Sequence, residues 1–480
     1  MARMIGRKAE IEELNRLYRS GNSEFLAVYG RRRVGKTFLI NEVFQDRLVF
    51  THTGLSPFDE GSRVTNKAQL LHFYHSLTTQ GLPETGCPKT WLEAFYMLEN
   101  LLKIKDNGSR QVVFIDELPW MDMPGSGLIT AVEAFWNGWA SARHNIMLIV
   151  CGSATSWILK NLVSAKGGLY GRLTYEMKIS PFTLAEVEEF FQSKEILLSR
   201  YDIAQAYMAF GGIPYYLNYF TKGKSLAQNI DQLMFAPNAR LGSEFNRLFG
   251  SLFRTPEPYE AVVRCLMRRR CGFTRGEISE AVGISSGKRL SDILSVLEAS
   301  DFIAHYKPFD AGRGETLYRL VDPFCRFHLY FKEQKNVTDA HYWQNELLQG
   351  GQNAWRGTAF EELCMNHIQQ IKRALGVEGV TSQESAYTLR ADENHDGIQC
   401  DLLIVRKDKV VNLCEMKFVD AEYAIDKRYD LVLRNRINPL RQQLKKSQTV
   451  HLTFITTYGV KYNTYSGIVQ CQVTLDDLFQ

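Results

Sequence analysis

The stretch FLAVYGRRRVGKTFLINEVF, which starts at Phe25, places the strongest constraint on the fold of this 480-residue chain. An apolar run ends at Gly30, Gly35-Lys36-Thr37 follows five residues later, and then an amphipathic helix pattern begins. This is the G-x-x-x-x-G-K-[ST] spacing in a strand, loop and helix setting. Glycines let backbone amides close around phosphate oxygens, and a helix N-terminus adds its positive dipole end. The stretch therefore predicts a phosphate-binding loop.

The residue types in this loop predict ATP and a magnesium ion as ligands. Lys36 would reach the terminal phosphates, and the Thr37 hydroxyl would ligate magnesium. The alternative is a glycine-rich turn in front of a basic helix. The residues predicted to contact the nucleotide are Gly30, Arg31, Arg32, Arg33, Val34, Gly35, Lys36, Thr37 and Phe38.

The segment RQVVFIDELPWM supplies the second magnesium element that such a loop needs. Its apolar run is typical of a buried parallel strand, and it ends in Asp116 and Glu117. Asp116 would hold the metal through water, and Glu117 would polarise the attacking water as a general base. The alternative is a solvated helix cap. A third strand, NIMLIVCGSAT, ends near Ser153, whose hydroxyl either senses the γ-phosphate or caps the next helix.

Length and composition bound the number of domains and the class of protein. A chain of 480 residues suggests roughly three domains of about 150 residues each. With 45% hydrophobic and 23% charged residues, the composition is that of a soluble globular protein, and the net charge of +4 indicates no partner by itself. The nine cysteines show no zinc-ligand spacing. We find no signal peptide or membrane span, so we expect a cytoplasmic protein with reduced thiols and no membrane partner.

Several short motifs follow one another along the first half of the chain: MIGRKAEIEEL, YGRRRVGKT, FIDELPW, CGSAT, GGLYGRLT and GGIPYYL. In this order they resemble the archaeal-type P-loop ATPases of the MNS clade, which are related to the STAND and AAA classes. The resemblance implies that Gly6 and Arg7 lie near the base of the nucleotide and that Pro214 packs beside it. It also makes Arg172 a candidate sensor or finger, acting within its own chain or across an interface of a homo-oligomer. The residue pattern alone favours a surface or structural ion-pair role for Arg172.

A different pattern begins near residue 255. Thr274 and Glu277 form a T-x-x-E capping box that opens a helix, and Gly283 ends it. Two alternating runs, FIAHYKPF and TLYRLV, then flank a glycine-containing turn and predict a hairpin. Short helices followed by a hairpin are the order of a winged helix-turn-helix.

A winged helix-turn-helix predicts DNA as a partner. Lys288 and Arg289 would sit at the exposed start of the helix that enters the major groove, and Arg313 would lie in the wing. The alternative is that the module packs against, or binds, another protein. Further along, the segment 427–446 carries seven basic residues against one acid, which suits a phosphate backbone.

The stretch DLLIVRKDKVVNLCEMKF reads as two strands joined by a charged turn. Alternate side chains of a strand share a face, so Glu415 and Lys417 project together, and the hairpin can bring Asp401 beside them. The E-x-K tripeptide alone is uninformative, because it also occurs at 176–178 and 333–335. Only here does an aspartate open a paired strand upstream.

With Glu361 on a helix pattern upstream, this layout resembles the restriction-endonuclease-like, PD-(D/E)xK, domains. The resemblance covers roughly residue 355 to the end of the chain. The carboxylates of Asp401 and Glu415, with Glu361 as a further ligand, would hold magnesium. Lys417 would position a water or stabilise developing negative charge. The alternative is a buried ion pair at a strand end.

These patterns together predict an α/β P-loop NTPase domain with a parallel sheet and a helical lid at 1–245. A winged helix-turn-helix at 250–335, a linker at 336–354 and an α/β restriction-endonuclease-like domain at 355–480 follow. We expect an ATPase that couples its nucleotide state to DNA binding and, in one interpretation, to metal-dependent cleavage. The alternatives are a nucleotide-controlled DNA-binding switch that does not cut, and a signalling or scaffold ATPase that binds proteins.

Overall fold

The computed structural model describes the chain except for residues 1–3, 58–63, 165–166, 310–315, 336, 348–351 and 390–397. For residues 347, 386–389, 398, 399 and 401 it describes the backbone only. The chain divides into two compact units. Unit 1 comprises 1–181, 246–256 and 295–301, and unit 2 comprises 182–245, 257–294 and 302–480.

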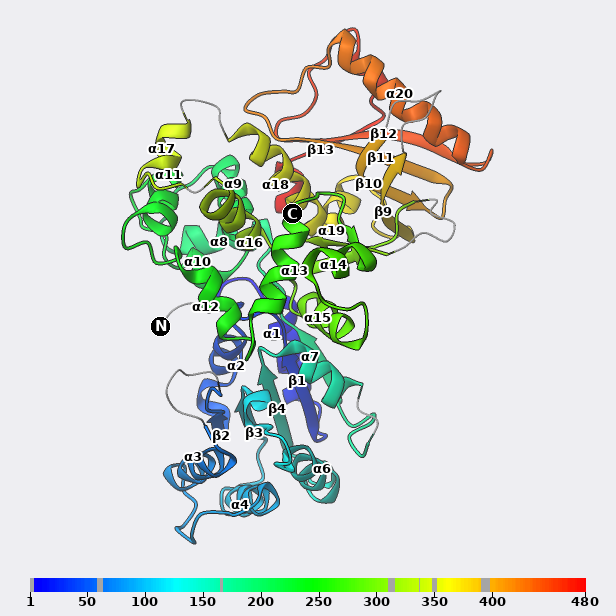
Figure 1. Ribbon diagram of the computed structural model, residues 1–480. Helices are drawn as coiled ribbons and strands as arrows, with labels where there is room; N and C mark the ends of the chain where they lie inside the picture. Colours follow the sequence, from blue (N-terminus) through cyan, green and yellow to red (C-terminus); the bar gives the residue numbers. More distant parts are fainter. Residues whose placement is uncertain are drawn as a thin grey trace. The chain divides into compact units, whose positions relative to one another are not determined.

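Unit 1 is built on a five-stranded sheet of order β2-β3-β4-β1-β5, in which every neighbouring pair is parallel (Figure 1). All residues of β3 and β4 are buried, as expected for central strands covered on both faces. The predicted parallel α/β core is therefore confirmed. The strands are β1 (Glu24–Tyr29), β2 (Leu48–Thr53), β3 (Gln111–Asp116), β4 (Ile146–Gly152) and β5 (Tyr175–Lys178).

Aromatic side chains from the helices fill one face of this sheet. Phe25 of β1 packs against Trp136, and Phe95 packs against Phe73 and Phe135. Burying each of these rings stabilises the layer by roughly 1.5–3 kcal/mol. The helices of this unit are α1 (Lys8–Tyr18), α2 (Lys36–Phe44), α3 (Asn66–Thr79), α4 (Trp91–Ile104), α5 (Leu118–Met121), α6 (Leu128–Gly138) and α7 (Thr155–Ile158), while α12 (Glu244–Gly250) leads into it from unit 2.

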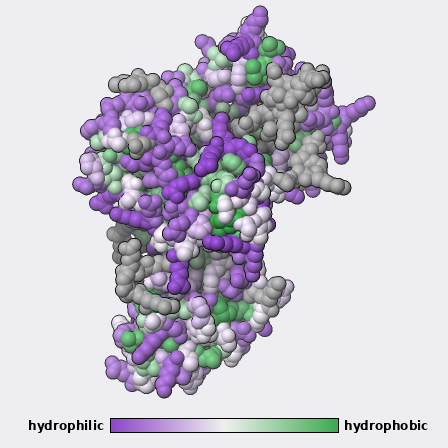
Figure 2. Space-filling model, in the orientation of Figure 1, coloured by the Kyte–Doolittle hydropathy of each residue, from purple (hydrophilic) through white to green (hydrophobic). Residues whose placement is uncertain are grey.

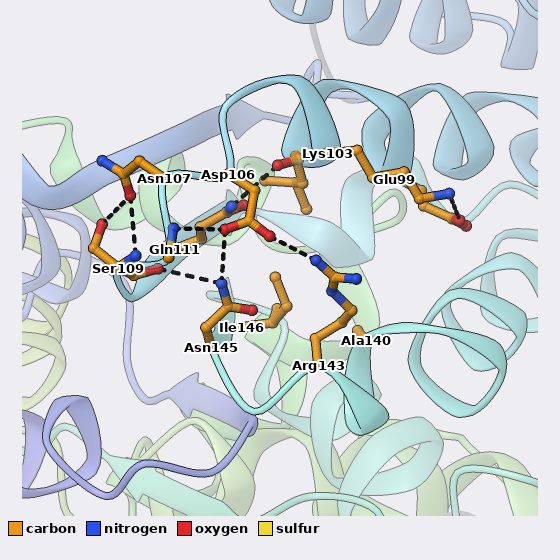
Figure 3. A network of polar contacts seen from close by, with 12 residues as sticks. Glu99, Lys103, Asp106, Asn107, Ser109, Gln111, Ala140, Arg143, Asn145 and Ile146 are labelled. Atoms are coloured by element: carbon orange, nitrogen blue, oxygen red, sulfur yellow. Dashed lines mark hydrogen bonds and ion pairs between the residues drawn. The ribbon is translucent and has the colours of Figure 1, made fainter.

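A polar network ties together the chain segments that enter β3 and β4 (Figure 3). The Asp106 carboxylate accepts hydrogen bonds from the Gly108 amide (3.0 Å), Arg143 (2.6 Å) and the Asn145 amide (3.2 Å). The backbone N–H of Gln111, the first residue of β3, donates to the Asn145 carbonyl at 2.8 Å. The network therefore fixes the amino ends of the two central strands.

The first part of unit 2 is helical. The segment 182–245, the last part of the region predicted as an ATPase domain with a helical lid (1–245), belongs to this unit, and the Phe182 amide donates to the Gly212 carbonyl at 2.6 Å. A Cβ added to Gly212 would lie 2.0 Å from the Phe182 carbonyl oxygen, so only glycine allows this approach. The helices are α8 (Leu184–Ser193), α9 (Arg200–Phe210), α10 (Pro214–Leu217), α11 (Leu226–Ile230) and α16 (Pro323–His328).

The segment predicted as a linker, 336–354, contains the helix α17 (Tyr342–Leu347). Trp343 is fully buried against Phe327 and Phe331, and its backbone N–H donates to Asp231 at 2.7 Å. The mostly polar composition of the segment predicted a linker, although the segment contains Trp343, whose buried side chain fixes it to the helices. The residues around Trp343 are therefore part of the packed helical region, unlike a free linker.

Three further helices and a small antiparallel sheet of order β6-β8-β7 follow the predicted order. The capping box is present, with Thr274 Oγ1 accepting from the Glu277 amide at 3.2 Å, and Gly283 adopts the left-handed conformation at the helix end. Arg313 lies outside the described residues. The elements are α13 (Glu257–Met267), β6 (Phe273–Thr274), α14 (Arg275–Val282), α15 (Lys288–Ala299), β7 (Ile303–Tyr306) and β8 (Leu317–Leu320).

The C-terminal part of unit 2 holds a mixed five-stranded sheet of order β13-β12-β11-β10-β9. Leu413 of β11 shares a core with Leu433 and Ile437 of α20, so the odd-numbered residues of β11 face that helix. The elements are α18 (Asn353–Asn366), α19 (Ile368–Ala374), β9 (Ser382–Leu389), β10 (Ile398–Arg406), β11 (Val410–Lys417), α20 (Lys427–Gln443), β12 (Thr449–Thr456) and β13 (Cys471–Thr474).

The face of the molecule shown in Figure 2 is mostly hydrophilic, with hydrophobic residues in small separate groups. Among the described residues, no helix combines the length and the apolar character that crossing a membrane requires.

We predict that Asp106→Ala lowers the stability of unit 1 by about 1–2 kcal/mol, because several hydrogen-bond donors lose a charged acceptor. Glu99→Ala is the matched control. Glu99 pairs with the exposed Lys103 one turn away on α4 and makes no hydrogen bond to Asp106, so its loss should cost less than about 0.5 kcal/mol. Urea unfolding followed by circular dichroism measures both variants. Equal effects of the two substitutions would contradict the role given to the network.

Candidate functional site

The predicted phosphate-binding loop connects β1 to α2, and two glycines shape it. Gly30 has φ of 139° and Gly35 has φ of 91°, both in the region that favours glycine. A Cβ on Gly30 would lie 2.2 Å from the Ile179 carbonyl oxygen, so a side chain there would push the loop off the sheet. Since α2 begins at Lys36, its free backbone amides face the loop.

The Lys36 ammonium is held inside this loop. Its Nζ donates to the Gly30 carbonyl at 2.9 Å and the Arg31 carbonyl at 3.0 Å, and the residue is only 6% exposed. A buried cation enclosed by a glycine-shaped loop suits the phosphate oxygens of a nucleotide.

The Thr37 hydroxyl donates to Asp116 Oδ2 at 2.7 Å. Thr37 comes from the first turn of α2 and Asp116 from the last position of β3, so the fold joins two residues 79 positions apart. The other oxygen, Oδ1, accepts from the Glu117 amide at 3.0 Å, which fixes the carboxylate plane. A hydroxyl and a carboxylate in contact are the oxygen ligands that Mg²⁺ prefers, so these residues fit the ion.

Glu117 is held beside this pair by an unusual backbone and by Ser153. The residue adopts the left-handed conformation, with φ of 48° and ψ of 43°. Its Oε2 accepts hydrogen bonds from the amide (2.9 Å) and the hydroxyl (3.0 Å) of Ser153. Burial raises the pKa of Glu117 above its ordinary value, while the Ser153 donors and the Lys36 charge oppose that rise. A carboxylate with a raised pKa suits proton abstraction near neutral pH.

The structure gives Ser153 a partner that the sequence did not predict. Its hydroxyl and amide both serve Glu117, so Ser153 positions the predicted base. A signal was available in the sequence, because Ser153 directly follows β4, the neighbour of β3 in the sheet. Carboxyl ends of parallel strands lie at one edge of a sheet.

The residues predicted from the family resemblance lie in different parts of the structure. Arg7 donates to the carbonyls of Val34 (3.3 Å) and Ser180, so it contacts the loop, and Gly6 precedes it with φ of 61°. Arg172 is exposed. Pro214 is the first residue of α10 in unit 2. The predicted roles of these residues toward the nucleotide remain predictions.

Sequence reasoning missed what Arg32 does. Its guanidinium lies over the Trp120 ring, 5.5 Å from the centroid, and its Nη1 donates to the Ser251 carbonyl at 2.9 Å. Ser251 belongs to the segment 246–256, which the chain contributes to unit 1 from far downstream. Local motif reading cannot find this contact, because it spans 219 positions.

The C-terminal candidate site centres on Glu415, which is 5% exposed. Its carboxylate accepts from the Tyr429 hydroxyl at 2.7 Å and from Arg436, and Lys417 Nζ lies 3.4 Å from Oε2. Burial, then the neighbouring carboxylate, raises the pKa of Tyr429, so its hydroxyl stays protonated and donates. Glu415 and Lys417 therefore share a face, as predicted. Tyr429 and Arg436 were missed, although a separation of seven residues places them on one face of a helix.

The other predicted metal ligands of this site are not shown together. Glu361 pairs with Arg270, and the neighbouring Glu362 pairs with Arg319 at 3.3 Å. Leu402 lies opposite Cys414, and Asp401 and Glu415 are their neighbours along β10 and β11. The side chain of Asp401 lies outside the described residues. Among the side chains that are described, no group of three or more His, Cys, Asp or Glu is arranged to hold a metal.

Residues 4–220 match a protein family described as an ATPase domain predominantly from Archaea. The chain thus carries an ATPase domain. An uncharacterized protein of Methanocaldococcus jannaschii is 24% identical over 375 residues, which are 77% of this chain and 78% of that protein.

Three solved structures are similar to this chain. A Walker-type ATPase of Pyrococcus abyssi has 18% identity and a TM-score of 0.47 over 68% of this chain and 96% of that one. The ORC2 protein of Aeropyrum pernix has 12% identity and a TM-score of 0.40 over 71% and 95%. The RuvB Holliday junction branch migration motor of Thermotoga maritima has 12% identity and a TM-score of 0.35 over 65% and 92%.

We predict that Ser153→Ala moves the acidic limb of the pH profile of kcat/KM for ATP hydrolysis to higher pH. The Ser153 hydroxyl stabilises the ionised form of Glu117, so its loss raises the pKa of that base further. The general base acts only when ionised, and its activity is lost as the pH falls through its pKa. Thr155→Ala, a hydroxyl substitution two residues further along, is the control. A limb that is identical in Ser153→Ala and in the wild type would contradict this assignment.

Proposed function

We propose that this chain binds and hydrolyses ATP with magnesium and uses its nucleotide state to control binding to DNA. The 2.7 Å contact between Thr37 Oγ1 and Asp116 Oδ2 carries the first half of the proposal. It joins the phosphate-binding loop to the metal-binding strand end, with Glu117 beside both. A bare glycine turn before a basic helix would not require this contact.

Each residue of the site has a distinct task in hydrolysis. The loop amides and Lys36 would bind the β- and γ-phosphates and offset their negative charge. Magnesium, held by Thr37 directly and by Asp116 through water, would supply charge neutralisation on the phosphate oxygens. Glu117 would accept the proton of the attacking water at its carboxylate, and Ser153 would hold that carboxylate in position.

Contacts inside unit 1 support coupling between the phosphate-binding loop and the helices α13, α14 and α15, which we call the three-helix module. Arg32 of the loop binds the carbonyl of Ser251, in the segment that precedes α13. Lys178 at the end of β5 pairs at 2.6 Å with Asp301, which follows α15. Both chain segments that flank 257–294 are thus anchored on the ATPase sheet. A displacement of the loop by nucleotide would reach the module through these anchors.

The order of elements in the module supports a winged helix-turn-helix that binds DNA. Lys288 and Arg289 are exposed at the start of α15, where a recognition helix presents its side chains. The basic helix α20 offers a second phosphate-binding surface. A protein-binding module remains the alternative that a DNA-binding assay decides.

Glu415 favours a second candidate function, a DNA-binding switch whose C-terminal domain does not cut. Both oxygens of its carboxylate already accept hydrogen bonds, from Tyr429 and Arg436. A magnesium ion would have to displace at least one of these donors, which costs a charge-assisted hydrogen bond. Magnesium-dependent nicking of plasmid DNA that is lost in Asp401→Ala would instead establish cleavage.

We predict that Lys36→Ala abolishes ATP hydrolysis and weakens ATP binding, because the loop loses its buried cation. Glu117→Gln should lower kcat by at least about a hundredfold, the usual contribution of a general base, while ATP binding persists. Lys8→Ala, at an exposed position of α1, is the control and should retain full activity. Steady-state phosphate release and calorimetric titration measure the two properties. Unchanged turnover in Lys36→Ala would refute the nucleotide site.

We predict that Lys288→Gln combined with Arg289→Gln weakens binding to duplex DNA. The slope of the logarithm of the binding constant against the logarithm of the salt concentration should become shallower by about 2, the equivalent of two lost phosphate contacts. The control is Lys67→Gln, which removes an exposed positive charge on α3. Mobility shift at several salt concentrations measures both. Binding that is absent at low salt in the wild type would favour the protein-binding alternative.

The same assay tests the coupling. ATP should change the DNA affinity of the wild type, and Arg32→Gln should reduce that change because the loop loses its anchor on Ser251. A response to ATP that is fully retained in Arg32→Gln would overturn the proposed route.

A further inference from the structure

Unit 2 contains a surface cavity of about 620 Å³, open to solvent, within the helical segment 182–245. The turn after α8, the turn after α10 and the chain after α11 line it. None of its lining residues belongs to the ATPase site or to the three-helix module. It is therefore a separate feature of the chain.

The cavity is lined by cations and by no carboxylate. Lys194, Lys222 and Arg240 are its charged residues. Lys222 pairs with Glu195, and both of these side chains are largely exposed, which makes the pair weak. Among the described residues, no carboxylate lies within ion-pair distance of Lys194 or Arg240. The cavity thus carries net positive charge.

Neutral groups hold the two unpaired cations in place. Lys194 Nζ lies over the Phe190 ring, 5.3 Å from its centroid, and donates to the Asn218 side-chain carbonyl. The Arg240 guanidinium lies over the Tyr219 ring at 4.9 Å. Aromatic faces and an amide orient these cations without cancelling their charge. Cations that are oriented in advance lose less entropy when an anion binds.

Uncharged groups complete the lining. Asn218, Thr221 and Gln232 add amide and hydroxyl groups, while Ile196 and Phe220 provide a buried apolar floor. Hydrogen-bond donors around several cations match an anion with more than one charged oxygen. Phosphate groups have this character, and arginine binds them through paired N–H donors.

We propose that this cavity is a second anion site, which binds the phosphate groups of a small polyphosphate-bearing molecule. The cations Lys194, Lys222 and Arg240 line one cavity, and in the described part of the chain only Lys222 has a carboxylate partner; this observation carries the proposal. The volume of the cavity supports a small molecule as the ligand. The phosphate backbone of DNA is the competing source of the same groups.

The test uses the full chain with Lys36→Ala, so that the phosphate-binding loop does not contribute. Inorganic tripolyphosphate is titrated calorimetrically without magnesium. We expect saturable binding that weakens with salt, and about a tenfold loss of affinity for each of Lys194→Gln and Arg240→Gln, the loss of one charge-assisted hydrogen bond. Lys67→Gln removes an exposed amine of α3 that does not line the cavity, and it should leave the affinity unchanged.

A second arm distinguishes the source of the phosphate. Duplex and single-stranded oligonucleotides are titrated against the same variants. Tripolyphosphate binding that depends on Lys194 and Arg240, with oligonucleotide binding unaffected by them, supports the proposal. Absent tripolyphosphate binding, or equal affinity in Lys194→Gln, Arg240→Gln and Lys67→Gln, would overturn it. Dependence of oligonucleotide binding alone on Lys194 and Arg240 would assign the cavity to a nucleic-acid backbone and would equally overturn it. Circular dichroism verifies that the variants fold. In chains that keep Lys36, the same substitutions should leave ATP hydrolysis unchanged, because they lie outside the ATPase site.

Discussion

The hydrogen bond between Thr37 and Asp116 is the interaction on which the proposed chemistry depends. It exists because β3 lies inside a parallel sheet whose strand ends share one edge, while the loop after β1 turns back over that edge. Gly30 allows the turn, since any side chain there would meet the Ile179 carbonyl. The polar network around Asp106 anchors the opposite end of β3 and β4. The order of the strands and the shape of the loop together therefore fix the positions of Thr37 and Asp116.

Glu117 and Ser153 show how the sheet positions the residues of the candidate site. The left-handed turn at Glu117 directs its carboxylate toward β4, where Ser153 provides two hydrogen-bond donors. Burial raises the pKa of this carboxylate, and the donors limit the rise. In the loop beside these residues, Arg32 donates a hydrogen bond to the carbonyl of Ser251. A residue of the nucleotide loop thereby contacts the segment that leads to the three-helix module.

Local sequence patterns predicted the parallel core, the loop and the capping box at Thr274, because each depends on neighbours in the chain. They could not predict the contact of Arg32 with Ser251, or the partners Tyr429 and Arg436 of Glu415, because tertiary packing selects these. The burial of Trp343 could not be predicted either, since the residues around it in the sequence are mostly polar. In the C-terminal sheet the shared face of Glu415 and Lys417 followed from strand periodicity, whereas the donors that occupy Glu415 did not.

The central claim is that the loop around Lys36 and the strand end at Asp116 together bind ATP and magnesium. The most direct measurement is calorimetric titration of the wild-type chain and of Thr37→Ala with ATP, each with and without magnesium. The account predicts that magnesium tightens ATP binding to the wild type and has little effect in Thr37→Ala. ATP binding that is absent in the wild type, or an equal magnesium effect in both proteins, would contradict it.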